Sequence, residues 1–154
     1  MTMRCLIWVF SIFSMTFCYS QSPIVSEIYF SNEVVTNAIS EDKYGFLWFG
    51  TDKGLLMYNG YEEISIELPK DNRNVKEITI ADDKVYIGTI SGSVYILDLE
   101  KRTVLSEISP FTKSPISSIL IIKDIMYIST YGDGLYMLNG KNKLEKVKGL
   151  VSED

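Results

Sequence analysis

The sequence predicts an all-β fold built from about three copies of one unit. An aromatic-rich apolar run followed by a polar turn recurs three times, and its aromatic residues Trp48, Tyr86 and Tyr127 stand 38 and 41 residues apart. A repeat of about 40 residues indicates a solenoid, a propeller or a similar array. The ten Tyr, seven Phe and two Trp also favour strands, because aromatic side chains pack well on a pleated surface.

The N-terminus has the layout of a secretory signal peptide, which we assign to residues 1–20. Residues 5–17 carry no charge and are too few to span a bilayer, which takes about 20 residues. Cys18 and Ser20 then place small residues just before the predicted cleavage point. A buried N-terminal strand or helix is the alternative. Lipidation at Cys18 is less favoured, because the bulky Phe17 precedes it.

The first unit is expected over residues 34–69, after a lead-in segment at 21–33. Polar or glycine-containing turns separate its four expected strands, which are 34–40, 46–50, 55–58 and 61–68. Asn59-Gly60 lies between two apolar runs and is a strong hairpin signal. Pro69 ends the unit, because proline cannot donate to a ladder.

The second and third units are expected over residues 75–108 and 115–149, with an incomplete end at 150–154. Their strands are expected at 76–81, 84–89, 93–97, 103–108, 116–122, 125–130, 135–138 and 144–147. The first two strands of each unit are nearly continuous apolar runs, which predicts burial on both faces. The fourth strands alternate with charged residues, as exposed edges do. A glycine after the second strand is expected to let the chain turn tightly.

A four-stranded antiparallel unit that is buried inside and solvated at its outer edge is a blade of a β-propeller. A solenoid fits less well, because its rungs are usually shorter and lack successive hairpins. Known rings hold about four to eight blades, so three blades form an incomplete ring. We therefore interpret the chain as the N-terminal fragment of a longer protein, or as a truncated reading frame.

Residues 38–55, followed by Tyr58-Asn59-Gly60, resemble the two-component regulator propeller repeat. The shared pattern is an acidic pair, a glycine, an aromatic strand with tryptophan, then Gly-Thr, Gly-Leu and Tyr-Asn-Gly. The second copy has Tyr86 in place of tryptophan, and the third has Ser129 in place of glycine. The resemblance implies the periplasmic sensor region of a membrane histidine kinase. Hybrid two-component sensors of Bacteroidetes that respond to oligosaccharides are of this kind, with a transmembrane helix and a kinase core downstream.

Composition excludes several kinds of site. The chain has no His, which rules out a histidine phosphoacceptor, a Ser-His-Asp triad and histidine metal ligands in these residues. Both cysteines lie within the predicted signal peptide, so the remainder has no disulfide framework or thiolate metal site. A net charge of −5 without a basic patch argues against nucleic acid as a partner.

Catalytic and metal motifs are also missing from the sequence. The acidic pairs Glu41-Asp42 and Asp82-Asp83 lack the ligand spacing of a calcium loop. No nucleophile motif or phosphate-binding glycine loop is found. We therefore expect no catalytic residue, no metal, no cofactor and no enzyme activity in this chain.

Ligand-binding residues are expected in the turns between the second and third strands of each unit. Equivalent turns of successive blades gather on one face of a propeller, and loops on a rigid scaffold often bind ligands. The candidates are Asp52, Lys53, Ser91, Tyr131 and Asp133. Ordinary solvated turns are the alternative. Trp48, Tyr86 and Tyr127 are assigned to the core rather than to sugar stacking, because each lies in mid-strand.

The leading hypothesis is a periplasmic ligand-sensing module, the N-terminal part of a two-component sensor, with an oligosaccharide or another small molecule as ligand. Its partners would be the downstream blades and domains of a longer chain, with membrane contact only through a downstream helix. Two alternatives stay open. One is a structural or interaction propeller of the cell envelope or secretion machinery, and the other is a fragment of a secreted propeller lyase or hydrolase.

Overall fold

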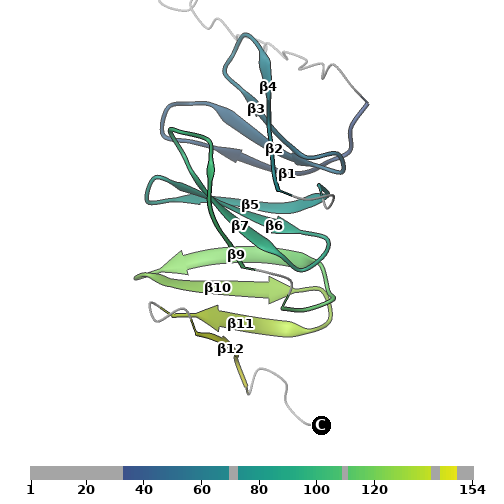
Figure 1. Ribbon diagram of the computed structural model, residues 1–154, viewed down its shortest axis with the longest axis vertical. Helices are drawn as coiled ribbons and strands as arrows, with labels where there is room; N and C mark the ends of the chain where they lie inside the picture. The colour runs from purple at the N-terminus through teal and green to yellow at the C-terminus, as the bar shows by residue number, and fades with distance from the viewer. Residues whose placement is uncertain (1–32, 70–72, 109–110, 140–142, 149–154) are drawn as a thin grey trace, which may run out of the picture.

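The structure, a computed structural model, describes residues 33–69, 73–108, 111–139 and 143–148. Within these ranges the regular elements are twelve β-strands and no helix. They form three four-stranded antiparallel sheets, stacked one after the next (Figure 1). The predicted all-β class and open arrangement of three blades are confirmed. The predicted signal peptide, the lead-in up to residue 32 and the chain end after residue 148 lie outside the described residues.

Each sheet is one blade, and its strands follow one another in space as they do in sequence. The first blade consists of β1 (Thr36–Glu41), β2 (Leu47–Thr51), β3 (Leu55–Tyr58) and β4 (Glu63–Ile66). The second consists of β5 (Val75–Ala81), β6 (Lys84–Thr89), β7 (Val94–Asp98) and β8 (Val104–Ile108). The third consists of β9 (Ile116–Ile122), β10 (Ile125–Thr130), β11 (Gly134–Leu138) and β12 (Leu144–Lys146).

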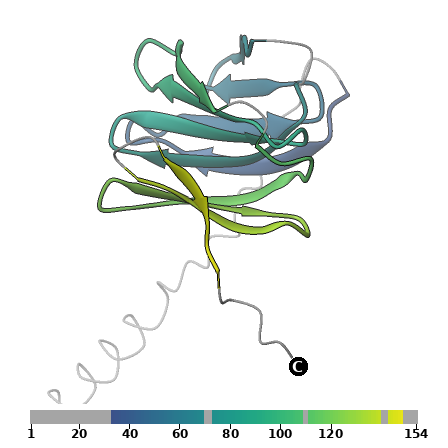
Figure 2. The same cartoon turned by 60° about the horizontal axis from the view of Figure 1, so that its bottom comes forward.

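The first strand of each blade is its inner strand. β1 lies against β5, and β5 lies against β9, whereas the fourth strands of the described blades make no comparable contact with one another. When the molecule is turned, the third sheet is still seen as a separate layer below the other two, which overlap in this view (Figure 2). Inner strands that meet and outer strands that stay apart are the geometry of propeller blades.

Two apolar layers fill the spaces between the blades. The layer between the first and second blades contains Trp48, Leu55 and Ile87, all fully buried. The layer between the second and third contains Val94 and Ile128, also fully buried. Successive side chains of a strand point to opposite faces, so the second blade contributes to both layers.

Gly50 and Gly88 set how closely the blades approach each other. A Cβ atom on Gly50 would lie 2.5 Å from Cγ1 of Val75, and one on Gly88 would lie 2.6 Å from Cγ2 of Ile116. Both distances are far below the optimal separation of carbon atoms, about 3.5–4.0 Å. Both glycines lie inside a second strand, and each makes room for the first residue of the next inner strand. The glycines that follow the second strands, Gly54, Gly92 and Gly132, have positive φ angles, which agrees with the predicted tight turns.

Burial on both faces, predicted for the first two strands of every blade, holds for β6 but not for β9. In β6, the residues from Val85 to Thr89 are all buried. In β9, Ile116 and Ile119 are buried, whereas Leu120 and Ile122 are exposed. The reason is position in the stack, because the second blade has a neighbour on each face and the third has one described neighbour only.

β4 is shorter than the strand predicted over 61–68. The side-chain oxygen of Asn59 accepts the backbone N–H groups of Tyr61 and Glu62, at 3.0 and 2.9 Å. An Asx turn of this kind occupies backbone donors near the start of a strand. Pairing with β3 therefore begins only at Glu63.

Candidate functional site

Asp52 and Lys53, predicted as ligand-binding residues, lie in the β2–β3 turn and bind the segment that precedes β1. One carboxylate oxygen of Asp52 accepts the backbone N–H of Val35 at 2.8 Å, and the Asp52 N–H donates to the Val35 carbonyl at 3.0 Å. The Lys53 ammonium donates to the carbonyl of Glu33. Both side chains therefore hold the chain at its entry into the first blade.

Ser91 and Tyr131 occupy the corresponding turns of the second and third blades. The Ser91 hydroxyl lies 2.9 Å from that of Thr89, which also accepts the backbone N–H of Ser93 at 3.1 Å. Tyr131 donates its backbone N–H to the Pro115 carbonyl at 2.9 Å, and its side chain is 66% exposed. Of the five predicted residues, Lys53 and Tyr131 are exposed, and Tyr131 is the aromatic one.

Asp133 is the centre of a hydrogen-bond network. Its carboxylate accepts from the hydroxyls of Thr112 and Tyr136 at 2.6 and 2.7 Å, and from the Lys146 ammonium at 2.8 Å. The bond from Lys146, followed by those from Thr112 and Tyr136, holds the pKa of Asp133 well below its usual range. The bond to Asp133 in turn raises the pKa of Lys146. Asp133 therefore ties β11, β12 and the connection from the second blade together.

The five predicted residues share one edge of the stack, because all three turns join a second strand to a third. Four of them make hydrogen bonds within their own turns or to the chain segment just before their blade, whereas Asp133 also binds Tyr136 in β11 and Lys146 in β12. None of them lines the three cavities described below. Their role in ligand binding stays a prediction.

Asp42, in the first of the two acidic pairs, is a structural residue of the β1–β2 turn. It is 6% exposed. One carboxylate oxygen accepts the indole N–H of Trp48 at 2.9 Å, and the other accepts the backbone N–H groups of Tyr44 and Phe46 at 2.9 and 3.0 Å. Trp48 is fully buried, which confirms its assignment to the core. An aspartate six residues before the tryptophan was the signal that could have revealed the pair.

A polar cavity of about 320 Å³ lies between the second and third blades, on the edge opposite the predicted turns. The hydroxyl of Tyr86 has no hydrogen-bond partner among the described residues, although the whole residue is only 6% exposed. Burial raises the pKa of Tyr86, and the charges of Asp82 and Asp124 raise it further. Lys84 and Asn139 also line the cavity. Tyr86 is thus a core residue, as predicted, whose polar end faces a cavity.

A second cavity, of about 250 Å³, lies at the junction of the first and second blades. The Tyr44 hydroxyl donates to Glu100 at 2.8 Å across this junction, and Arg102 also lines the cavity. Lys43 forms an ion pair with Asp83 at 2.5 Å. That hydrogen bond raises the pKa of Lys43 above its usual range. Both junction cavities combine aromatic and charged side chains, and the cavity beside Tyr86 also has the amide of Asn139. Such groups suit a polar ligand.

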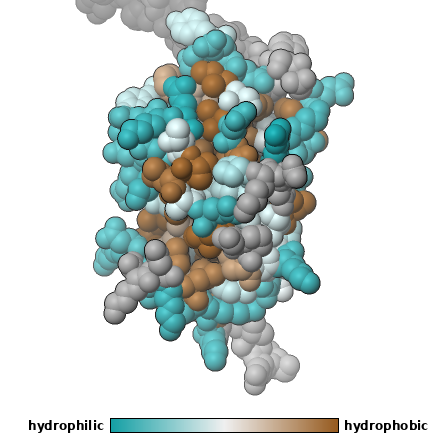
Figure 3. Space-filling model, in the orientation of Figure 1, coloured by the Kyte–Doolittle hydropathy of each residue, from teal (hydrophilic) through white to brown (hydrophobic). Residues whose placement is uncertain are grey.

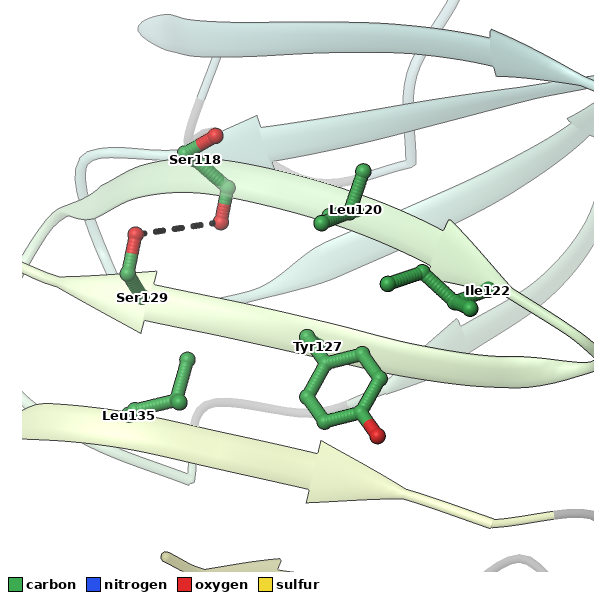
Figure 4. A pocket seen from close by; sticks show the side chains of 6 residues that line it. All are labelled: Ser118, Leu120, Ile122, Tyr127, Ser129 and Leu135. Atoms are coloured by element: carbon green, nitrogen blue, oxygen red, sulfur yellow. Dashed lines mark hydrogen bonds between the residues drawn. The ribbon is translucent and has the colours of Figure 1, made fainter.

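The third cavity is an apolar hollow of about 300 Å³ on the third blade. We call it the open face, and it is lined by Ser118, Leu120, Ile122, Tyr127, Ser129 and Leu135. These side chains come from β9, β10 and β11 and point away from the second blade, which lies behind them (Figure 4). Apolar residues are also exposed on the outer surface along the stack of blades (Figure 3). Tyr127 is half-buried here, so its predicted core position holds only in part.

No group of three or more acidic, His or Cys side chains suited to a metal ion occurs among the described residues. No helix in that part of the chain is long and apolar enough to cross a membrane.

Comparison with known proteins supports the resemblance. Residues 29–53 match the family model described as "Two component regulator propeller". The extracellular domain of BT4673 from B. thetaiotaomicron, described as a hybrid two-component system, is 23% identical with a TM-score of 0.67, over 79% of this chain and 17% of that one. The corresponding domain of BT3049 is 25% identical with a TM-score of 0.62, over 79% of this chain and 18% of that one. No curated protein sequence matches the chain.

The same fold occurs in proteins of other kinds. Virginiamycin B lyase from Staphylococcus aureus is 16% identical with a TM-score of 0.70, over 82% of this chain and 46% of that one. At such identities the likeness shows the propeller fold and leaves the activity open, since one fold hosts many functions. The chain spans less than a fifth of the length of the two extracellular domains.

Proposed function

We propose that the chain is a periplasmic ligand-sensing propeller module, the N-terminal part of a two-component sensor. The observation that carries the proposal is the match of residues 29–53 to the two-component regulator propeller repeat. Similarity to extracellular domains of proteins described as hybrid two-component systems supports it. The signal-peptide layout of residues 1–20 supports export.

The proposed role is binding rather than chemistry. A ligand that binds two blades at once would favour one relative arrangement of them, and differential affinity for two arrangements is what shifts an equilibrium. The polar cavity beside Tyr86 lies at such a junction, with groups from the second and third blades. A kinase in a downstream part of a longer chain would respond to the shift.

The proposed ligand is an oligosaccharide, the class implied by the resemblance. Hydroxyl groups of a sugar would pair with carboxylate, ammonium and amide side chains, and its apolar ring faces would pack on aromatic rings. Two places in the described structure offer this combination. One is the junction cavity with Tyr86 and Asp124, and the other is the predicted turn edge with the exposed Tyr131.

The proposal is tested by calorimetric titration of the secreted chain, and of the complete ectodomain of its gene, with a panel of oligosaccharides. We expect saturable heat with at least one of them. Tyr131→Ala tests the turn edge, and Tyr86→Phe tests the junction cavity. A substitution at the true site that removes about 1.4 kcal/mol of binding free energy lowers the affinity tenfold. Leu105→Ala, on the outer strand β8, is the matched control. Absence of binding to the whole panel, or turnover of the sugar, would refute the proposal.

A further inference from the structure

The open face of the third blade uses positions that are buried in the other two. Trp48 and Tyr86, the equivalents of Tyr127, are 0% and 6% exposed, whereas Tyr127 is half-buried. Leu55 and Val94, the equivalents of Leu135 by strand pairing, are fully buried, whereas Leu135 is half-buried. These positions hold aromatic or aliphatic residues in all three blades. They differ in whether another blade packs over them.

In the first two blades the cover is the next blade along the chain. Val75, at the start of β5, closes over Gly50, and Ile116, at the start of β9, closes over Gly88. Leu120 is 54% exposed on the open face. Its equivalent Thr79 donates a hydrogen bond to the Ile119 carbonyl of the next blade at 2.7 Å. The open face is therefore a third junction of the same kind, in which the incoming strand is missing from the described residues.

We propose that the open face docks a fourth blade of the same repeat, carried by the same polypeptide, whose inner strand places a small side chain opposite Ser129. Continuity with the two observed junctions identifies the occupant as a blade. The chain spans only 17% and 18% of the extracellular domains it is similar to, which leaves room for such a blade. The inference does not depend on what the molecule senses.

Ser129 is the reason that we expect a small side chain on the incoming strand. It replaces the glycine of the other blades, where a Cβ atom would lie 2.5 Å from Val75 or 2.6 Å from Ile116. Its hydroxyl lies 2.8 Å from that of Ser117 and donates to the Ser118 carbonyl at 3.5 Å (Figure 4). Valine or isoleucine on the incoming strand would therefore collide with Ser129, whereas alanine or glycine would fit. Leu120 offers no donor, so this junction has more apolar contact than the one at Thr79.

The test supplies a fourth blade directly. A copy of residues 109–148 is joined after Lys148 and compared with the secreted chain. Four versions are made. Position 116 of the copy is Ile or Ala, and position 129 of the original third blade is Ser or Gly. The fitting pairs are Ala at 116 with Ser at 129, and Ile at 116 with Gly at 129. We expect each fitting pair to slow amide exchange in the original β10 and β11, whereas dye binding should stay level because the copied blade carries an open face of its own. The Ala copy should melt at least about 3 °C above the Ile copy when Ser129 is present. In the Ser129→Gly background the order should reverse.

The copied blade also provides its own control. Met126→Lys in the copy alone places a charge on the copied face that should dock, while the three original blades stay unchanged. It should restore the fast exchange of the secreted chain in the original β10 and β11. The proposal is overturned if added blades leave that exchange unaltered, or if the Ile and Ala copies keep one order of melting temperature whatever residue stands at 129. A measured mass of twice the chain, with loss of dye binding, would assign the face to a second copy and also overturn it.

Discussion

Trp48 donates its indole N–H to the carboxylate of Asp42 at 2.9 Å, and both side chains are buried inside the first blade. The same carboxylate holds the β1–β2 turn closed through two backbone N–H groups. The best-matched copy of the repeat is therefore fastened by an acid–tryptophan pair. The later copies do without it, because Tyr86 and Tyr127 replace the tryptophan.

Asp42→Ala should destabilise the protein by about 3 kcal/mol, because each buried donor left without an acceptor costs about 1–3 kcal/mol. Glu41→Ala is the matched control. Glu41 is the neighbouring acid and is exposed, so its loss should change stability by no more than about 0.5 kcal/mol. Urea unfolding followed by tryptophan fluorescence measures both. Equal effects of the two substitutions would contradict the structural role of Asp42.

Gly50→Ala should cost about 1–3 kcal/mol of stability through overpacking, since the new methyl group would meet Val75. The loss should be smaller when Val75→Ala is already present, because contacting residues do not behave additively. A double-mutant cycle in urea measures the coupling. Additive losses would show that the glycine is not needed for the approach of the blades.

Asp133 should make stability depend on pH. Its pKa is lowered in the folded state, so its contribution is present above the unfolded value of about 3.9 and is lost as pH falls through the folded value. Asp133→Asn should therefore lower the melting temperature at pH 7, and the difference from the parent should shrink towards pH 2. Asp124→Asn, in an exposed turn, is the control. A difference that stays constant between pH 7 and pH 2 would argue against the network.

Lys146 should make the stability supplied by the same network depend on pH at the alkaline end as well. Its pKa is raised by the bond to Asp133, so its contribution is present below the unfolded value of about 10.4 and is lost as pH rises through the folded value. Melting curves of the parent and Lys146→Met should converge at high pH. Lys113→Met, at another exposed position, should leave the curve parallel to that of the parent.

Leu120→Lys should leave the stability of the chain within about 0.5 kcal/mol while lowering apolar dye binding. Leu120 is 54% exposed on the open face. Met126→Lys, on the opposite face of the same blade and only 6% exposed, should cost about 3–5 kcal/mol, because it buries an unpaired charge. Dye fluorescence together with urea unfolding separates the two. Similar losses would show that the open face is covered.

Most of the fold could be predicted from local patterns. The repeat of Trp48, Tyr86 and Tyr127 gave the number of blades, and the turns gave the hairpins. Strand ends were less certain, because the Asn59 side chain takes up N–H groups that the predicted strand would have used. The site was predicted least well. Turn residues such as Asp52 and Asp133 were identified by position, but their hydrogen bonds to Val35 and Lys146 join residues distant in sequence.

The sequence alone determined that this chain is all-β and that it repeats one four-stranded unit, since alternation, glycine turns and aromatic spacing are local properties. Tertiary structure decided what each repeated position does. Gly50 became a contact surface for Val75, Asp42 became the partner of Trp48, and Tyr127 became part of an uncovered face. The physical reason is that burial depends on which blade lies opposite, and equivalent residues in neighbouring repeats do not share the same neighbours.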